Sequence, residues 1–274
     1  MPGPDAAPPG VDPTKPAAAR VYDYILGGSQ NFEVDRLTVE KTRQGLPELE
    51  DIAWSNRGFH QRAARWLVAE AGIRQFLDIG SGLPTQRNTH EVVQEVNPDA
   101  QVVYVDIDPM VKAHAADLLH GSPHTTFITG DVREPDGILK NVQTRALLDF
   151  DQPIGLFMTG LLMLVDDDFD PRGLVTRYLD ALVPGSYLAL SHPTDDKQSP
   201  EVANRFRGVL GKGGNFNLRS RAYIENLFDG LELVPPYSGA DPHITFAGLW
   251  GAEDPTEADS DGSRWMLAGL ARKP

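Results

Sequence analysis

Residues 76–85 read FLDIGSGLPT, and this stretch decides the fold class. The run up to Ile79 is short, apolar and typical of a buried strand, and it leads directly into the turn Gly80-Ser81-Gly82. Glycine at both ends of this turn allows a ligand to lie against bare backbone. The segment therefore predicts a strand, a binding turn and a following helix.

Strand and helix patterns alternate on both sides of this turn. The expected strands are residues 75–79, 102–105, 125–129, 154–158, 187–190, the region near 231–234, and 264–270. The expected helices are residues 57–71, 88–96, 109–121, 136–148, 171–182, 200–210 and 221–228. Such alternation indicates an α/β fold with a mostly parallel sheet and right-handed crossovers. Sheets of this kind bind ligands beyond the carboxyl ends of their strands.

Acidic residues accompany the first three strands at this edge. Asp78 precedes the turn, Asp106 directly follows the second strand, and Asp131 follows the third. A carboxylate beside the turn would repel the pyrophosphate of a dinucleotide, and the third glycine of the dinucleotide fingerprint is absent. Asp106 is placed to accept both ribose hydroxyls of an adenosine, and Asp131 to accept the adenine amino group. S-adenosylmethionine, which carries an ammonium and a sulfonium, suits these carboxylates better than a nicotinamide dinucleotide.

Three motifs then resemble a known family. FLDIGSG, VVYVDIDP and TGDV resemble motifs one to three of class I S-adenosylmethionine-dependent methyltransferases. Together with ARVYDYILGGSQNFEVDR, SNRGFHQRAARWL and LDIGSGLPTQRNTHEV, they resemble the S-adenosyl methyltransferase family first catalogued as a domain of unknown function. The likeness runs from about Pro16 to Ala271. It implies a Rossmann-like, seven-stranded, mostly parallel sheet with helices on both faces and its last strand antiparallel beside the fifth, but no particular substrate.

The resemblance also assigns residues to the cofactor, S-adenosylmethionine, and its product, S-adenosylhomocysteine. The implied cofactor-binding residues are Asp78, Gly80, Ser81, Gly82, Asp106, Ile107, Asp131, Val132, Thr159 and Gly160. The fourth motif maps to residues 158–161, where no Asn-Pro-Pro-Tyr occurs. This departure argues against methylation of nucleic-acid bases or glutamine and leaves small-molecule O-, N- and C-acceptors open.

The N-terminal region divides into two expected parts before a catalytic domain at residues 57–274. Residues 1–16 are rich in proline and predict a disordered tail. Residues 17–56 predict a helical lid, in which the double glycine at 27–28 gives flexure. The lid residues proposed to contact the cofactor are Tyr22, Tyr24, Gly28 and Asn31. Asn56 and Arg57 are placed to reach the methionine carboxylate, although Asn56 is equally suited to capping a helix.

His192, after the fifth strand, is the best-placed candidate for a general base, although a loop histidine fixed by the following proline is an equally ordinary interpretation. The histidines show no metal-ligand spacing, and no cysteine is present, so we expect no catalytic metal. No nucleophile elbow or Walker loop is present, which disfavours hydrolases and nucleotidases.

Composition restricts the partners. The chain of 274 residues has 25 Lys and Arg against 39 Asp and Glu, a net charge of −14 that opposes binding to nucleic acid or an anionic membrane. With no apolar run of spanning length and no signal-peptide pattern, we expect a cytoplasmic enzyme acting on a small molecule, of unknown oligomeric state. The alternatives are a non-catalytic module that binds S-adenosylmethionine or a nucleoside and, less favoured, a nicotinamide-dependent oxidoreductase.

Overall fold

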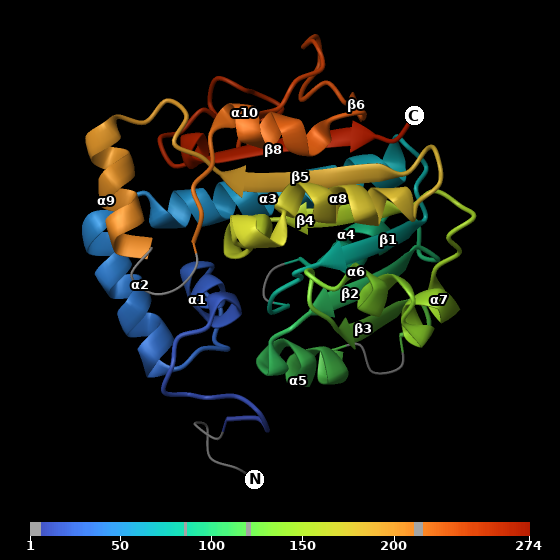
Figure 1. Cartoon of the computed structure of the whole chain (residues 1–274), viewed down its shortest axis with the longest axis horizontal. Helices are drawn as coiled ribbons and strands as arrows, with labels where there is room; N and C mark the ends of the chain where they lie inside the picture. Colours follow the sequence, from blue (N-terminus) through green and yellow to red (C-terminus); the bar gives the residue numbers. More distant parts are fainter. Residues whose placement is uncertain (1–6, 85–86, 119–121, 211–215) are drawn as a thin grey trace.

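The computed structural model describes residues 7–84, 87–118, 122–210 and 216–274. Its centre is one sheet in the order β3-β2-β1-β4-β5-β8-β6, with β7 paired to β8 (Figure 1). The strands are β1 (Gln75–Ile79), β2 (Gln101–Asp106), β3 (Thr125–Thr129), β4 (Gly155–Thr159), β5 (Tyr187–Pro193), β6 (Glu232–Leu233), β7 (Thr245–Phe246) and β8 (Met266–Arg272). Strands β1 to β5 are parallel, and β8 runs antiparallel to β5. The predicted sheet is confirmed, and β7 is a short additional strand.

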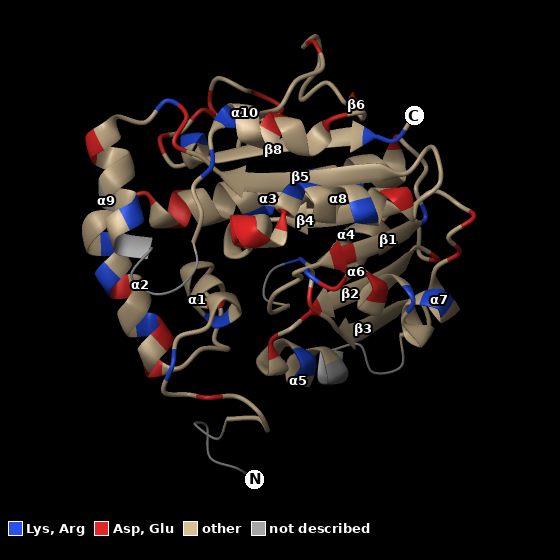
Figure 2. Cartoon of the chain, in the orientation of Figure 1, with Lys and Arg blue, Asp and Glu red and all other residues tan. Residues whose placement is uncertain are grey.

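Helices pack on both faces of the sheet (Figure 1). They are α1 (Ala18–Ile25), α2 (Glu33–Gly45), α3 (Leu49–Ala69), α4 (Thr89–Gln94), α5 (Pro109–Leu118), α6 (Pro135–Leu139), α7 (Val142–Leu147), α8 (Pro171–Asp180), α9 (Pro200–Leu210) and α10 (Arg221–Glu225). Charges of both signs occur along α2 (Figure 2). In the described part of the chain, no helix combines the length and apolarity needed to cross a membrane.

The pleat of β1 divides the core into two layers. Phe76 belongs to the cluster that contains Leu67 of α3 and Val92 of α4. Leu77 and Ile79 point to the other face, in a cluster with residues of α8. Because side chains alternate along a strand, Asp78 lies on the same face as Phe76, below α3 and α4. This register brings the carboxylate of Asp78 to the side chains of those helices.

One helix boundary and one strand boundary that affect the site differ from the predicted ones. Helix α3 begins at Leu49 rather than at residue 57, so the boundary that we expected between residues 56 and 57 falls inside a helix. Strand β5 continues to Pro193, so His192 is a strand residue and not a loop residue. The β5 extension escapes prediction because tertiary contacts bury the polar residues Ser191 and His192. The α3 extension escapes prediction because Asn56 resembles a helix cap but lies inside the helix.

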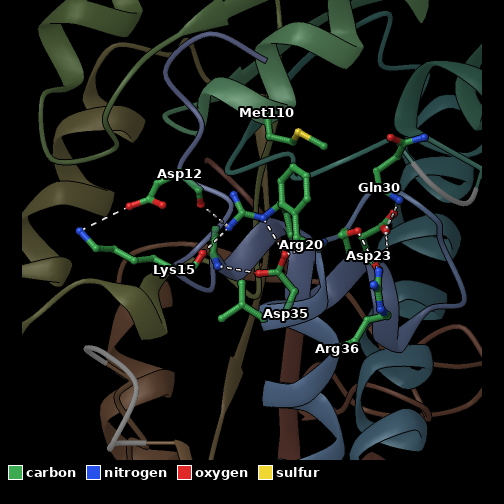
Figure 3. A network of polar contacts seen from close by, with 12 residues as sticks. Asp12, Lys15, Arg20, Asp23, Gln30, Asp35, Arg36 and Met110 are labelled. Carbon is green, nitrogen blue, oxygen red and sulfur yellow. Dashed lines mark hydrogen bonds and ion pairs between the residues drawn. The ribbon is translucent and has the colours of Figure 1, made fainter. Parts of the chain in front are cut away.

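The N-terminal region lies at the edge of the sheet where the parallel strands end (Figure 1). Its helices α1 and α2 are joined by a buried ion pair between Arg20 and Asp35, with Nε and Oδ2 2.8 Å apart (Figure 3). Residues 7–16 differ from the disordered tail that we expected. Val11 packs against Met110 of α5, and the Arg20 guanidinium donates to the carbonyl of Lys15. Residues 1–6 lie outside the described residues.

Candidate functional site

A cavity of about 370 Å³ opens at the carboxyl ends of β1 to β4. Thirteen of the predicted residues line it: Tyr22, Asn56, Arg57, Asp78, Gly80, Ser81, Gly82, Asp106, Ile107, Asp131, Val132, Thr159 and Gly160. Helix α1 adds Ala18 and Ala19 to the wall. The cavity is therefore built from the turns that the sequence singles out and is walled on one side by the N-terminal region.

The glycine turn follows β1 with its backbone in the left-handed region. Gly80 has φ +71° and Gly82 has φ +64°, conformations that side chains disfavour. The Gly80 and Ser81 amides donate to the Val105 carbonyl at 2.8 and 3.1 Å, which holds the turn against β2. A Cβ placed on Gly82 would meet no atom within 4 Å. The turn thus presents bare backbone to open space, as a ligand laid over it requires.

The carboxylate of Asp106 is fixed at the end of β2. Its Oδ2 accepts the Gly82 amide at 2.8 Å, and its Oδ1 accepts the Asp108 amide at 2.9 Å. Burial raises the pKa of Asp106, while these amide hydrogen bonds lower it. The neighbouring Ile107 side chain is 57% exposed beside the cavity. A rigid carboxylate next to an exposed apolar side chain suits a ribose and the face of a base.

Asp131, after β3, is engaged by a neighbour. Its two oxygens accept hydrogen bonds from Arg133 Nε, both at 2.9 Å, and Arg133 lowers the pKa of Asp131. Next to it, the Val132 carbonyl accepts the Tyr178 hydroxyl at 3.0 Å, which fixes this edge of the cavity. The predicted role of Asp131 toward an adenine amino group therefore requires it to share its oxygens with Arg133.

Asp78 is buried beneath the turn. Its Oδ2 accepts the Thr89 hydroxyl at 2.5 Å, and the same hydroxyl lies 2.7 Å from Nε2 of His60. His60 Nδ1 lies 2.8 Å from the Thr159 hydroxyl. Burial raises the pKa of Asp78 to about 6, against the opposing effects of the Thr89 hydrogen bond and the Arg57 charge. Burial and Arg57 hold the pKa of His60 well below its ordinary value.

Tyr22, Asn56 and Arg57 form the wall between α1 and α3. The Tyr22 hydroxyl donates to the Ala53 carbonyl at 3.1 Å and accepts from Asn56 Nδ2 at 3.2 Å. Asn56 lies inside α3, so the capping interpretation of this residue is wrong. The Arg57 side chain donates to Asn88 Oδ1 at 3.3 Å and lines the cavity. The predicted contact between Arg57 and the carboxylate of a ligand is compatible with this position in the cavity wall.

Three predicted lid residues do not line the cavity. The Tyr24 hydroxyl donates to Glu40 of α2 at 3.2 Å. Asn31 Nδ2 donates to Asp23 Oδ2 at 2.8 Å and to the Gly28 carbonyl at 3.0 Å. These contacts order the turn between α1 and α2. The prediction that Tyr24, Gly28 and Asn31 contact the cofactor is corrected accordingly: these residues shape the connection, and α1 reaches the cavity through Tyr22.

His192 is corrected as well. Its side chain is fully buried and does not line the cavity. Its Nδ1 lies 2.8 Å from the Pro193 carbonyl, and its Nε2 lies 2.8 Å from an Arg219 nitrogen that can only donate. Burial lowers the pKa of His192 to about 3. A neutral histidine with both ring nitrogens engaged inside the protein is a structural group and not a general base for an acceptor.

Sequence reasoning missed several lining residues, among them His60, Arg133, Leu161, Met163 and Leu164. His60 sits within SNRGFHQRAARWL, at helical spacing from Asn56, a pattern that marks one helix face. Leu161 to Leu164 follow β4 at the carboxyl edge of the sheet, where parallel sheets bind ligands. Among the described residues, no group of three or more His, Asp or Glu side chains is arranged to hold a metal ion.

The chain resembles known proteins in sequence and in fold. A family model described as S-adenosyl methyltransferase matches residues 4–274. The crystal structure of a candidate methyltransferase from Thermobifida fusca YX is 42% identical, with a TM-score of 0.89 over 97% of this chain and 98% of that chain. A DUF574 family protein from Streptomyces avermitilis MA-4680 is 36% identical, with a TM-score of 0.87 over 95% and 98% of the two chains.

A more distant structure shares the fold alone. An O-methyltransferase family protein from Burkholderia thailandensis is 12% identical, with a TM-score of 0.51 over 95% of this chain and 64% of that chain. A search of curated proteins finds no significant match.

Proposed function

The chain belongs to the S-adenosyl methyltransferase family, and we propose that it transfers a methyl group from S-adenosylmethionine to a small-molecule acceptor. The observation that carries this proposal is the open backbone cradle at Gly82 beside the anchored carboxylate of Asp106. When bound, S-adenosylmethionine supplies an electrophilic methyl group on a sulfonium. In-line displacement at that carbon depends mainly on the relative placement of donor and acceptor.

The residues present fit such a cofactor. Asp106 offers two fixed oxygens to ribose hydroxyls, and Ile107 and Val132 offer apolar contact to the base. Arg57 offers a cation to the methionine carboxylate, and Asp78 a carboxyl group to the ammonium. At Gly80 and Gly82 the turn contributes backbone alone, because glycine has no side chain. The chain's own residues thus bind and orient the donor without a metal-ligand cluster among the described residues.

The acceptor side of the cavity favours a small molecule with apolar surface. Leu161, Met163 and Leu164 line the cavity after β4, and Leu164 is 40% exposed. Helix α1 bounds the same space through Ala18 and Tyr22. An opening walled in this way, on a protein with a net charge of −14, disfavours a long anionic polymer as acceptor.

Calorimetric titration with S-adenosylmethionine, followed by incubation with a broad panel of phenols, amines and carboxylic acids, tests this function. We expect binding, and mass gain of one methyl group in at least one acceptor together with S-adenosylhomocysteine. Binding without turnover across the panel favours the non-catalytic module. Binding of NADH in place of S-adenosylmethionine favours the oxidoreductase.

Asp106→Ala tests the ribose contact. We expect a loss of about 1.5–3 kcal/mol in S-adenosylmethionine affinity, the range for hydrogen bonds to a charged group. The fold survives because Asp106 lies at a strand end beside the cavity. Asp229→Ala is the matched control, since Asp229 pairs with Arg172 on the surface. Equal affinity of the Asp106 variant and the control by calorimetry removes Asp106 from the site.

The wall formed by α1 predicts ligand-dependent protection. Because Ala18, Ala19 and Tyr22 line the cavity, S-adenosylhomocysteine is expected to slow amide hydrogen exchange in residues 18–25 as well as in residues 80–82. Helix α7, which does not line the cavity, serves as the internal control. Unchanged exchange in α1, with protection limited to the glycine turn, assigns α1 to ordinary packing and excludes a lid.

A further inference from the structure

A line of four side chains runs along the cavity wall, and cofactor binding gives its two middle members, His60 and Thr89, no role. It runs from Thr159 through His60 and Thr89 to Asp78, with successive polar atoms 2.8, 2.7 and 2.5 Å apart. His60 and Asp78 are each 4% exposed and border the cavity, as does Thr159 at the end of β4. The line therefore connects a carboxyl group to a hydroxyl through two side chains packed behind the ligand space.

The number of protons restricts how these hydrogen bonds point. An ionised Asp78 only accepts, so the Thr89 hydroxyl donates to it. Thr89 then has no second proton and must accept from Nε2–H of His60, whose bare Nδ1 accepts the Thr159 hydroxyl. When Asp78 is protonated, every bond reverses. Nδ1–H of His60 then donates to Thr159, whose own proton is turned toward other acceptors.

The surroundings keep His60 neutral and Asp78 able to change its protonation. The His60 ring packs against Phe157 with centroids 4.7 Å apart, and burial with the Arg57 charge opposes a cationic ring. Asp78 is faced by Arg57 of α3, which lowers its pKa, and by Asp106 of β2, which raises it. Tyr104 of β2 also lies close, and its hydroxyl accepts the His90 amide at 2.8 Å. Burial is the largest effect, and the resulting pKa of about 6 leaves Asp78 mostly ionised at neutral pH.

We propose that His60 is a positioning residue that passes the proton released on methylation of an O–H or N–H acceptor from Thr159 to Asp78. This inference rests on the proposed methyl transfer. The acceptor proton moves to Thr159 Oγ1 as the Thr159 proton moves to Nδ1 of His60. The Nε2 proton moves to Thr89 Oγ1, and the Thr89 proton moves to Oδ2 of Asp78. The bonds balance, since each intermediate group gains one proton and loses one, and Asp78 becomes a neutral acid.

Nitrogen-15 NMR of the histidine-labelled full chain tests this arrangement without any acceptor or cofactor. The His60 signals are identified by their absence in His60→Asn. We expect a neutral ring with the proton on Nε2 above about pH 7 that moves to Nδ1 below about pH 5, around the Asp78 titration. A cationic His60, or one unchanged tautomer across this range, overturns the relay.

Three variants at the two ends of the line test whether Asp78 and Thr159 determine the tautomer of His60. Asp78→Asn removes the titrating group and is expected to give a tautomer that does not change with pH. Thr159→Val removes the outer partner of Nδ1 and is expected to shift the transition to lower pH, whereas Thr159→Ser restores it. If the His60 tautomer changes at the same pH in Thr159→Val and Thr159→Ser, the proposal is overturned. This comparison does not depend on Asp78→Asn, so it remains decisive if that variant does not fold. If no acceptor in the panel is methylated but the His60 tautomer still changes with pH, the result contradicts methyl transfer. The hydrogen-bonding arrangement of the four side chains is then still supported.

Discussion

Gly82→Val is expected to abolish S-adenosylmethionine binding while the sheet stays folded. The valine side chain would occupy the open space beside the turn, where the ligand lies, and a β-branched residue at φ +64° is strained. We expect affinity to fall by more than about a hundredfold, or about 2.8 kcal/mol. Calorimetric titration measures the affinity, and far-ultraviolet circular dichroism checks the fold.

Gly72→Val separates strain from obstruction. Gly72 follows α3 with φ +68°, a Cβ added to it would meet no atom within 4 Å, and it does not line the cavity. Both variants therefore carry a similar backbone cost of about 1–3 kcal/mol in stability. Only Gly82→Val is expected to lose binding. Normal binding by Gly82→Val would show that the ligand does not lie over this turn, and the central assignment would then be wrong.

The sheet and the turn were predictable because they depend on local patterns. Strands β1 and β3 have the predicted bounds, since short runs of apolar or β-branched residues between helices have few alternatives. The acids at the strand ends were predictable too, because the carboxyl ends of parallel strands share one edge. These rules place Asp78, Asp106 and Asp131 without knowledge of any long-range contact.

The lid residue that reaches the cavity and the role of His192 were not predictable, because both depend on contacts between residues distant in sequence. Whether Tyr22 or Tyr24 reaches the cavity depends on the rotation of α1, which α2 and α3 determine through contacts distant in sequence. His192 has a suitable position in the chain, but its neighbour Arg219 lies 27 residues away and occupies its ring nitrogen. His60 lies within the predicted helix, but its place in the site depends on contacts with Thr89 and Thr159, which are 29 and 99 residues away in the sequence.

Asp35→Ala is expected to destabilise the protein strongly, by about 3–5 kcal/mol, the range for breaking a buried ion pair. Asp35 is fully buried and accepts three hydrogen bonds, from Arg20 Nε at 2.8 Å, the Ala17 amide at 3.0 Å and the Phe32 amide at 2.9 Å (Figure 3). Its loss leaves the Arg20 charge, 3% exposed, without a carboxylate. Urea unfolding of both proteins measures the change.

We expect the loss of stability in Asp35→Ala to appear first in the wall of the cavity, because Arg20 lies in α1 near Ala19 and Tyr22. Faster hydrogen exchange in residues 17–36, with weaker S-adenosylmethionine binding, would follow from detachment of α1. Asp136→Ala is the matched control, since its pair with Lys140 is solvent-exposed and screened by water. Arg20→Met combined with Asp35→Leu is expected to recover part of the stability, because no buried charge remains. If Asp35→Ala costs no more than Asp136→Ala, the pair does not hold α1 to α2, and the apolar contacts of Leu26 and Val39 must anchor the wall instead.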